Sequence, residues 1–282
     1  MLVTHDVGQA ITVRRDRNEE TAWELDYGAK PKPFIHPLRT PAGHCLSLAE
    51  PYDHLWHRGL WFAYKFVNGD NFWEENVDHG VQRATSVPEI SHQGDDQVSI
   101  RMNLAWKQPG TGDTVLAEDR SISYSPGESV DMFNWVTSLT AQRDVVLDRT
   151  PYTTWGGYGG LSFRGSRSWA VERYLLPEAA TPDRPAGQRG AWCDLSGKLD
   201  GGANLSGGIA MLDHPENIRY PTPWYAGGGS GTFINAALLF DEPLSFAAGE
   251  KLRLRYRVLV HDGVWDRARV DAEHAQFISE SA

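Results

Sequence analysis

The sequence predicts an all-β fold of antiparallel strands, and three features support this prediction. The 28 glycines and 16 prolines are scattered along the 282 residues as turn residues and do not gather in one linker. Short runs of alternating apolar and polar residues lie between them, as expected of a sandwich or barrel. In the clearest run, KLRLRYRVLVH at residues 251–261, five apolar side chains share one face, while Arg253, Arg255 and Arg257 face water.

The same alternation predicts the other elements in order along the chain. Strands are expected at residues 98–106, 121–124, 129–139, 208–212 and 233–240. Residues 176–190, with three prolines, are predicted to be a surface loop, and residues 220–231 either a connector or a lid with glycine hinges. Only the tail after Gly263 has a helical pattern. We find no internal repeat, so we predict one domain over residues 1–282.

Charge and hydropathy exclude several classes of protein. The formal net charge of −10 argues against a nucleic-acid-binding protein and against docking to anionic membrane surfaces. No run reaches the roughly 18 consecutive apolar residues of a membrane-spanning helix. The N-terminus does not resemble a secretory signal, so Cys45 and Cys193 are expected to be reduced and buried, and the expected location is the cytoplasm.

Residues 52–75, YDHLWHRGLWFAYKFVNGDNFWEE, form the most informative segment. Eight aromatic residues are interspersed with polar side chains that can titrate or form hydrogen bonds, among them His54, His57, Arg58, Asp70, Glu74 and Glu75. Aromatic faces next to such groups suit a ring with one apolar face and a rim of hydroxyls, which describes a sugar. The alternative is a core strand rich in aromatic residues with polar neighbours at the surface.

The spacing of His54 and His57 leaves their role open. On a helical turn, residues three apart would share a face, whereas on a strand they would point to opposite faces. The apolar run after Gly59 indicates that a strand begins there and that the histidines precede it. A bound Zn or Mn ion is an alternative, with a further ligand from His36, His79, Glu74 or His214. The HxxH spacing by itself is a weak metal signal because it lacks the glutamate of HExxH.

Glu74 is the candidate carboxylate of this segment. It adjoins Glu75 at an expected strand end, where adjacent side chains face opposite ways, so at most one enters a pocket. If Glu74 packs against Trp73 away from water, its pKa would rise and it could act as an acid or base. The alternative is a solvated turn.

Three later segments supply further candidates. In LDHPENIRYPTPW, residues 212–224, Pro215 ends a strand, and the residues presented at its rim are His214, Asn217, Arg219 and Trp224. Trp192 could offer a stacking platform, and Arg164 could pair with a carboxylate or a substrate oxygen, or simply pack. We expect the loops near residues 55 and 220 to converge on one concave β surface.

Other enzyme classes lack their motifs. The chain has no GxSxG elbow, no P-loop, and no strand–GxGxxG–helix unit with a downstream acidic residue. This argues against a serine-triad hydrolase and against an enzyme that uses nucleotides or nicotinamide cofactors.

Four stretches resemble a bacterial family that carries the name methane oxygenase PmoA: residues 34–75, YGGLSFRG at 158–165, DHPENIRYPTPW at 213–224, and LSFAAGEKLRLRYRVLVHDG at 244–263. The name does not fit, because a methane monooxygenase subunit spans a membrane and this chain has no segment to do so. The closing run is also similar to the last strand of galactose-mutarotase-like supersandwiches. The resemblance implies two large antiparallel sheets with a short C-terminal helix and a protein that handles a sugar, including an oxidised one. The family supplies no catalytic residues to carry over.

The leading hypothesis is therefore an enzyme that acts on a mono- or small oligosaccharide by proton transfer, in the manner of a mutarotase, epimerase or lyase. His54 or His57 would be the acid and Glu74 the base. The substrate-binding candidates are His36, Trp56, Arg58, Trp192, His214, Asn217 and Trp224. A metal-dependent sugar hydrolase or lyase with His54, His57 and His79 as ligands, and a non-catalytic sugar-binding module, are the alternatives. No resident cofactor is expected. An exposed strand edge could be covered by a second copy of the chain, in a homo-oligomer, or by the C-terminal helix.

Overall fold

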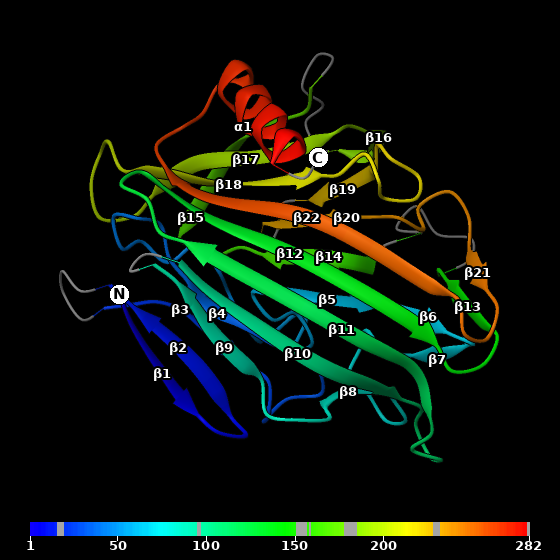
Figure 1. The fold of residues 1–282 in the computed structure, drawn as a ribbon. Helices are drawn as coiled ribbons and strands as arrows, with labels where there is room; N and C mark the ends of the chain where they lie inside the picture. The colour runs from blue at the N-terminus through cyan, green and yellow to red at the C-terminus, as the bar shows by residue number, and fades with distance from the viewer. Residues whose placement is uncertain are drawn as a thin grey trace.

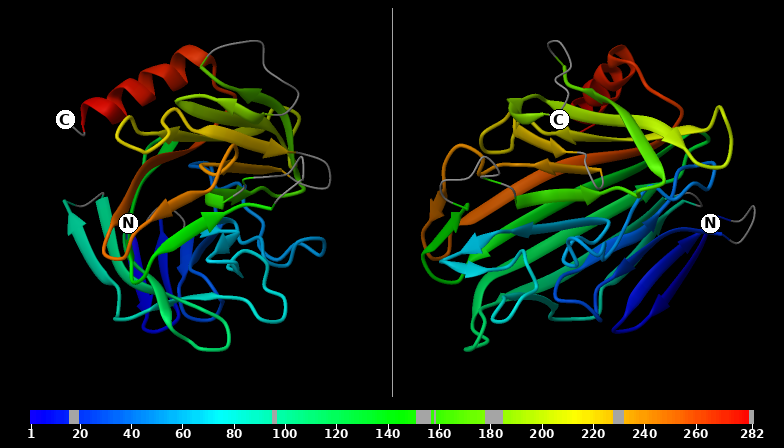
Figure 2. Two further views of the ribbon diagram at one scale, coloured as in Figure 1. Left: turned by 90° about the vertical axis from the view of Figure 1, so that its right-hand side faces the viewer. Right: turned by 180° about the vertical axis from the view of Figure 1, so that it is seen from behind.

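The computed structural model describes residues 1–15, 20–94, 97–150, 157, 159–177, 185–227 and 232–280. Within these ranges the chain forms two nine-stranded antiparallel sheets, one four-stranded antiparallel sheet and one helix. The two large sheets lie against each other as two layers, and the helix lies over the outer side of one of them (Figures 1 and 2). The prediction of an all-β fold with two large antiparallel sheets and a short C-terminal helix is confirmed.

The first sheet brings strands from both halves of the chain together. Neighbouring strands along it are β1 (Leu2–Asp6), β2 (Ala10–Arg14), β3 (Thr21–Asp26), β4 (Phe34–Leu38), β5 (Leu60–Tyr64), β14 (Gly159–Arg164), β20 (Phe233–Ala236), β19 (Pro223–Gly227) and β16 (Ala186–Arg189). Because β14 lies between β5 and β20, segments near residues 60, 160 and 235 become neighbours.

The second sheet contains the longest strands. Their order is β15 (Trp169–Leu175), β17 (Trp192–Leu199), β18 (Ser206–Asp213), β22 (Lys251–Asp262), β12 (Val130–Ala141), β11 (Thr114–Ser125), β10 (Gln97–Lys107) and β8 (Val81–Ala84), with β9 (Glu89–Gln93) also paired to β10. A small sheet at one end comprises β21 (Leu244–Phe246), β13 (Val145–Asp148), β6 (Phe66–Val67) and β7 (Asp70–Asn71).

Most strand predictions agree with these elements, and two loop predictions were partly wrong. The five predicted runs fall on β10, β11, β12, β18 and β20, although β20 ends at Ala236. Within the loop predicted at residues 176–190, Ala186–Arg189 form strand β16, and residues 178–184 lie outside the described ranges. Within the loop predicted at 220–231, Pro223–Gly227 form strand β19, and residues 228–231 lie outside the described ranges. Backbone pairing with β20 overrides the turn-forming residues on either side.

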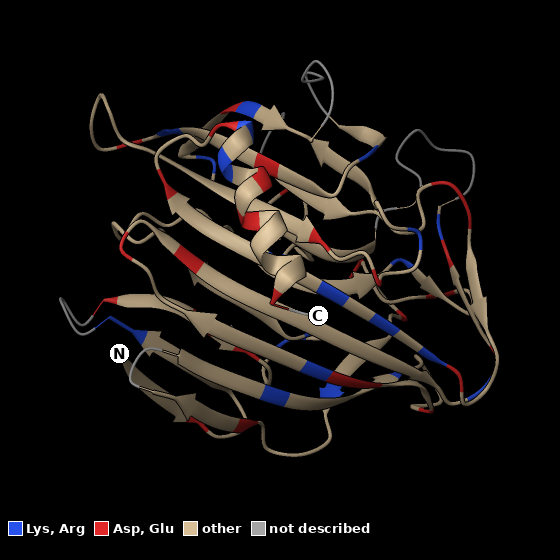
Figure 3. Cartoon of the chain, turned by 45° about the horizontal axis from the view of Figure 1, so that its top comes forward, with Lys and Arg blue, Asp and Glu red and all other residues tan. Residues whose placement is uncertain are grey.

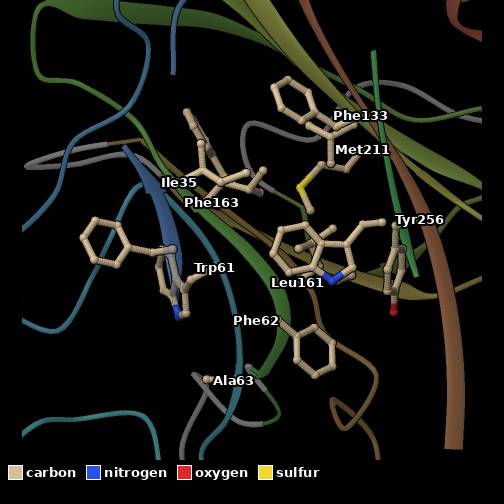
Figure 4. Packing of buried hydrophobic residues seen from close by; sticks show 14 of the residues in the cluster. Ile35, Trp61, Phe62, Ala63, Phe133, Leu161, Phe163, Met211 and Tyr256 are labelled. Atoms are coloured by element: carbon tan, nitrogen blue, oxygen red, sulfur yellow. The ribbon is translucent and has the colours of Figure 1, made fainter. Parts of the chain in front are cut away.

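The core lies between the two large sheets and is rich in aromatic residues. Phe62 and Leu161 from the first sheet meet Met211 and Tyr256 from the second, and all four are at most 1% exposed (Figure 4). Period-two alternation sends Trp61 to the opposite side of β5 from Phe62, and the figure shows it set apart from them. The outer side of the first sheet therefore also carries buried aromatic surface.

Helix α1 (Arg267–Ser279) covers one end of the outer side of the second sheet (Figure 1). The Asp266 side chain caps it by accepting a hydrogen bond from the Arg269 backbone N–H, and Val270 and Phe277 pack on apolar residues of β18 and β22. The prediction that Arg257 faces water was wrong because α1 covers it. Its side chain is 2% exposed beneath the helix and donates a hydrogen bond to Glu280. No helix within the described ranges has the length and apolar character needed to cross a membrane.

The indole N–H of Trp192 fastens α1 to the sheet. Trp192 is 1% exposed, and its Nε1 donates a 2.9 Å hydrogen bond to Oδ1 of Asp271. Asp271→Ala removes the acceptor, so the free energy of unfolding is expected to fall by about 1 kcal/mol in urea denaturation. Trp192→Phe removes the donor and also shortens a buried ring, so it should cost more than Asp271→Ala, and the double variant should cost about 1 kcal/mol less than the sum of the two. Additive costs would contradict a direct bond between the two side chains.

Candidate functional site

His54 and His57 lie on a tight loop that leads into β5, as predicted. Ala49 and Arg58 form an isolated antiparallel bridge, and the loop between them turns twice through backbone bonds from His54 to Pro51 and from His57 to His54, each 2.9 Å. Gly59 follows with φ of +68°, and a Cβ at this position would lie 2.3 Å from the carbonyl oxygen of Ile35. Only glycine fits this junction without strain, so it fixes how the loop meets the strand.

The two imidazoles lie in a group of aromatic rings, which we call the histidine cluster: His54, Trp56, His57, Trp61, Trp73 and Phe233. His57 stacks on His54 with ring centroids 4.7 Å apart and on Phe233 with centroids 5.1 Å apart. Trp61 approaches His57 at 5.2 Å, and Trp56 meets His54 edge-on at 5.4 Å. The sheet order explains the assembly, since β14 alone separates β5, which bears Trp61, from β20, which bears Phe233.

His57 is held in its neutral form. Its side chain is 6% exposed, and burial lowers its pKa to about 2, with further lowering by the charges of His54, Arg164 and Lys32. The contact with Arg164 fixes the tautomer. A guanidinium can only donate, so Nδ1 of His57, 3.4 Å from Nη1 of Arg164, accepts, and Nε2 carries the proton. His57 is thus a neutral hydrogen-bond donor at neutral pH.

His54 differs from its neighbour because it reaches the surface. Its side chain is 43% exposed, and its Nδ1 lies 3.4 Å from a carboxylate oxygen of Asp53. The same carboxylate accepts a 2.8 Å bond from Arg167 and longer contacts from Arg164. This Nδ1 has no hydrogen-bond partner among the described residues, so Asp53 acts on the ring through its charge and not through a hydrogen bond. A solvent-exposed histidine beside a carboxylate can act as a general acid or base.

Arg58, predicted to bind substrate, makes ion pairs with two carboxylates. Its guanidinium donates to Glu50 at 2.7 Å and to Glu75 through two nitrogens, and Lys32 reaches the same Glu75 at 2.9 Å. Burial acts to raise the pKa of Glu75, but Arg58 and Lys32 outweigh it and lower that pKa. Lys32 is 2% exposed; burial lowers its pKa to about 8 against the opposing effect of Glu75. Lys32 also donates to the backbone oxygen of Trp73 at 2.7 Å, which fixes that ring beside His57.

The remaining acid–base and metal candidates have other partners. Glu74 is mostly buried in an ion pair with Lys65, and Nδ1 of His79 bonds the backbone oxygen of Asn76. His36 has its Nδ1 2.7 Å from Oγ of Ser47. Among the described residues, no group of three or more His, Cys, Asp or Glu side chains is arranged to hold a metal ion. Both cysteines are free, and Cys45 is only partly buried.

Four predicted binding residues lie in other parts of the fold. Trp192 and His214 contact α1, the latter through an edge-on ring contact with Phe277 at 5.2 Å. The Asn217 amide bonds Asp213 and the backbone of Arg255, so it clips the loop to β22. Trp224 is fully buried and donates to the Gly190 oxygen at 2.9 Å. The structure brings His54, Trp56 and His57 together. The contacts of the four residues above are with other residues and not with these three.

Sequence reasoning missed several residues of the site. Asp53, Trp61, Trp73 and Phe233 surround the imidazoles, and Tyr225 extends the aromatic surface through its contact with Phe233 at 6.0 Å. Residues 225 and 233 could not be linked to residue 57 without the strand order. Alternation along residues 60–64 places Trp61 on the opposite side of β5 from Phe62, but all five side chains are apolar or aromatic, so the sequence did not show which side faces the histidines.

The outer side of the second sheet bears two adjoining hollows of about 580 and 450 Å³. Both are lined by Glu89, Arg101 and Ser121, and charged bands cross the strands of this face (Figure 3). The described residues that line them include no aromatic or imidazole side chain. The histidine cluster is therefore the stronger candidate for chemistry.

Several solved structures are similar to this chain at low identity. The heparan sulfate lyase HepC of Pedobacter heparinus is 8% identical with a TM-score of 0.47, over 94% of this chain and 37% of that one. The GH36 alpha-galactosidase AgaB of Geobacillus stearothermophilus is 11% identical with a TM-score of 0.46, over 93% and 41%. A galactose mutarotase-like protein of Lactobacillus casei is 7% identical with a TM-score of 0.39, over 93% and 100%. The chain thus spans about two fifths of the length of the first two.

Sequence comparison is more specific about the family. No curated protein matches the chain. The resemblance to the family named PmoA stays a prediction, because no comparison carries that name. One family model matches residues 11–275, nearly the whole length. The chain belongs to the family described as "Family of unknown function (DUF6807)".

Proposed function

We propose that the protein is a carbohydrate-active enzyme that transfers protons on a mono- or small oligosaccharide, in the manner of a mutarotase, epimerase or lyase. The contact between Arg164 and the buried, neutral imidazole of His57, next to the solvent-exposed His54, is the observation that carries the proposal. Two histidines 4.7 Å apart in different environments can divide the work of proton transfer and oxygen binding.

His54 is the proton-transfer group in this proposal. The carboxylate of Asp53 lies 3.4 Å from its Nδ1, and the exposed part of the ring can receive or deliver a proton at a sugar carbon or oxygen. Such a group contributes about 10²- to 10⁴-fold to a rate. Asp53 takes the place given to Glu74 by the sequence argument, because Asp53 lies beside His54 while Glu74 is paired with Lys65.

His57 binds oxygen in this proposal. A neutral imidazole with its proton on Nε2 donates a hydrogen bond to a carbonyl or ring oxygen without giving up the proton. The surrounding aromatic residues suit a sugar. Trp56 is half-buried next to the imidazoles. Tyr52 is 78% exposed, and the guanidinium of Arg167 lies over its ring, 4.2 Å from the centroid. Rings of this kind stack on the apolar face of a pyranose.

Binding and turnover can be tested with one panel of neutral and acidic monosaccharides. Because Trp56, Trp61 and Trp73 belong to the cluster, a sugar that binds there is expected to change the tryptophan fluorescence of the protein in a saturable way. Turnover is followed by deuterium uptake from D₂O into the sugar, by mutarotation, and by ultraviolet absorbance of an unsaturated product. Trp56→Phe should reduce the fluorescence change, and Trp265→Phe, next to α1, should leave it unaltered.

The outcomes separate the candidate functions. Saturable binding with deuterium uptake or mutarotation supports the enzyme. Saturable binding with none of these reactions contradicts the enzyme and supports a binding module. Turnover that a chelator abolishes and Zn or Mn restores would support the metal-dependent alternative instead.

A further inference from the structure

Arg164 is a buried guanidinium whose contacts are long. It is 4% exposed, yet its nitrogens reach His57 only at 3.4 Å and the two oxygens of Asp53 only at 3.3 and 3.5 Å. Its Nε has no hydrogen-bond partner among the described residues. Arg58, equally buried, makes contacts of 2.7 and 2.9 Å to its carboxylates. A buried guanidinium normally has close acceptors, whereas the nearest side-chain acceptor of Arg164 among the described residues lies 3.3 Å away.

Besides the acceptors that Arg164 already reaches on Asp53 and His57, the histidine cluster contains further N–H donors. Nε1 of Trp61, a fully buried residue, also has no partner among the described residues, and the tautomer of His57 directs a third N–H away from Arg164. The charged groups that act on His57 include Arg164 and Lys32 as cations, the latter paired with Glu75, and Asp53 as an anion. Such a place favours a ligand group that accepts hydrogen bonds and carries negative charge.

We propose that Arg164 is the anchor for a carboxylate of the substrate and that the histidine cluster therefore takes acidic sugars, such as uronic acids, in preference to neutral ones. A guanidinium matches a planar carboxylate through two parallel hydrogen bonds. Arg167, 36% exposed and bound to the same Asp53, adds positive charge at the open side. This inference rests on the proposed function, since it names the substrate class of that same site.

Isothermal titration of the full chain with matched ligands tests the inference. The probes are D-glucuronate, D-galacturonate, their methyl esters, and the neutral sugars D-glucose and D-galactose. At least one uronate is expected to bind about tenfold or more tightly than its own methyl ester, because esterification removes the charge and leaves the ring unchanged. Arg164→Gln should remove this preference, and Arg164→Lys should retain part of it, because lysine keeps the charge without the fork.

Arg101→Gln is the matched control, because Arg101 is an exposed arginine that lines both hollows on the other side of the molecule. It is expected to leave the preference intact; if it removes the preference, the site lies in the hollows. Equal affinity for acid and ester overturns the inference while sugar binding, and with it the proposed function, survives. If no sugar binds, both fail. Should Arg164→Gln not fold, the ester comparison on the unaltered protein tests the carboxylate, and Arg164→Lys tests the anchor.

Discussion

Replacement of His54 by glutamine is expected to lower kcat on a responsive sugar by about 10²-fold or more, with a much smaller change in KM. Glutamine retains a polar group of similar reach but cannot titrate, so it keeps substrate contacts and loses proton transfer. The exposed ring and the carboxylate of Asp53 at 3.4 Å are the features that assign this role to His54. The measurement is the rate of deuterium uptake or mutarotation under saturating substrate.

His92 supplies the control for this prediction. It is an exposed histidine on β9 next to the hollows of the second sheet, and His92→Gln should leave kcat unaltered. Asp53→Asn should lower kcat less than His54→Gln does, because Asp53 acts on the imidazole through its charge without touching the substrate. It should also displace the pH profile of kcat, which a merely structural role would not do. Equal rates for the unaltered protein and His54→Gln would remove His54 from the mechanism.

Acidification is expected to destabilise the protein through His57. The pKa of this side chain is about 2 in the folded state and 6.5 in the reference state, so below pH 6.5 the unfolded chain takes up a proton that the folded chain does not. Stability is therefore lost as the pH falls from about 6.5 toward 2. Between about pH 7 and about pH 5 the loss from this one group is about 2 kcal/mol.

A variant without the imidazole isolates this contribution. Urea unfolding of the unaltered protein and of His57→Gln is compared at both pH values. Other histidines whose pKa is lowered by partial or full burial, such as His36 and His274, act alike in both proteins and cancel. The unaltered protein should lose about 2 kcal/mol more than the variant. Identical pH dependence in the two proteins would show that His57 can be protonated in the folded state.

The fold could be predicted from sequence because its strands obey a local rule. In β12 and much of β22, apolar and polar residues alternate in the sequence as buried and more exposed side chains alternate in the structure. The segment after Gly263, which has a helical pattern, contains α1. The rule failed where a distant element intervened. Arg257 is buried because α1 covers it, and residues 223–227 form a strand because β20 is there to pair with them. Neither partner can be read from the segment itself.

The site could be predicted only for the part that is contiguous in sequence. Residues 52–75 identified His54, Trp56 and His57, which do lie together. Phe233 and Arg164 join them because β14 and β20 follow β5 in the sheet, an order fixed by long-range pairing. The sequence does not show whether a polar or aromatic side chain is exposed for binding or buried in the structure. Three predicted binding residues are bonded within the fold: Trp192 to Asp271, Asn217 to Asp213 and Trp224 to Gly190. These contacts depend on the tertiary structure.

A crystal structure with a bound sugar tests the central claim most directly. With a uronate present, we expect a sugar oxygen within about 3 Å of Nε2 of His57 and the carboxylate against the guanidinium of Arg164. A sugar seated in the hollows lined by Glu89, Arg101 and Ser121, with the histidine cluster unaltered, would contradict the claim.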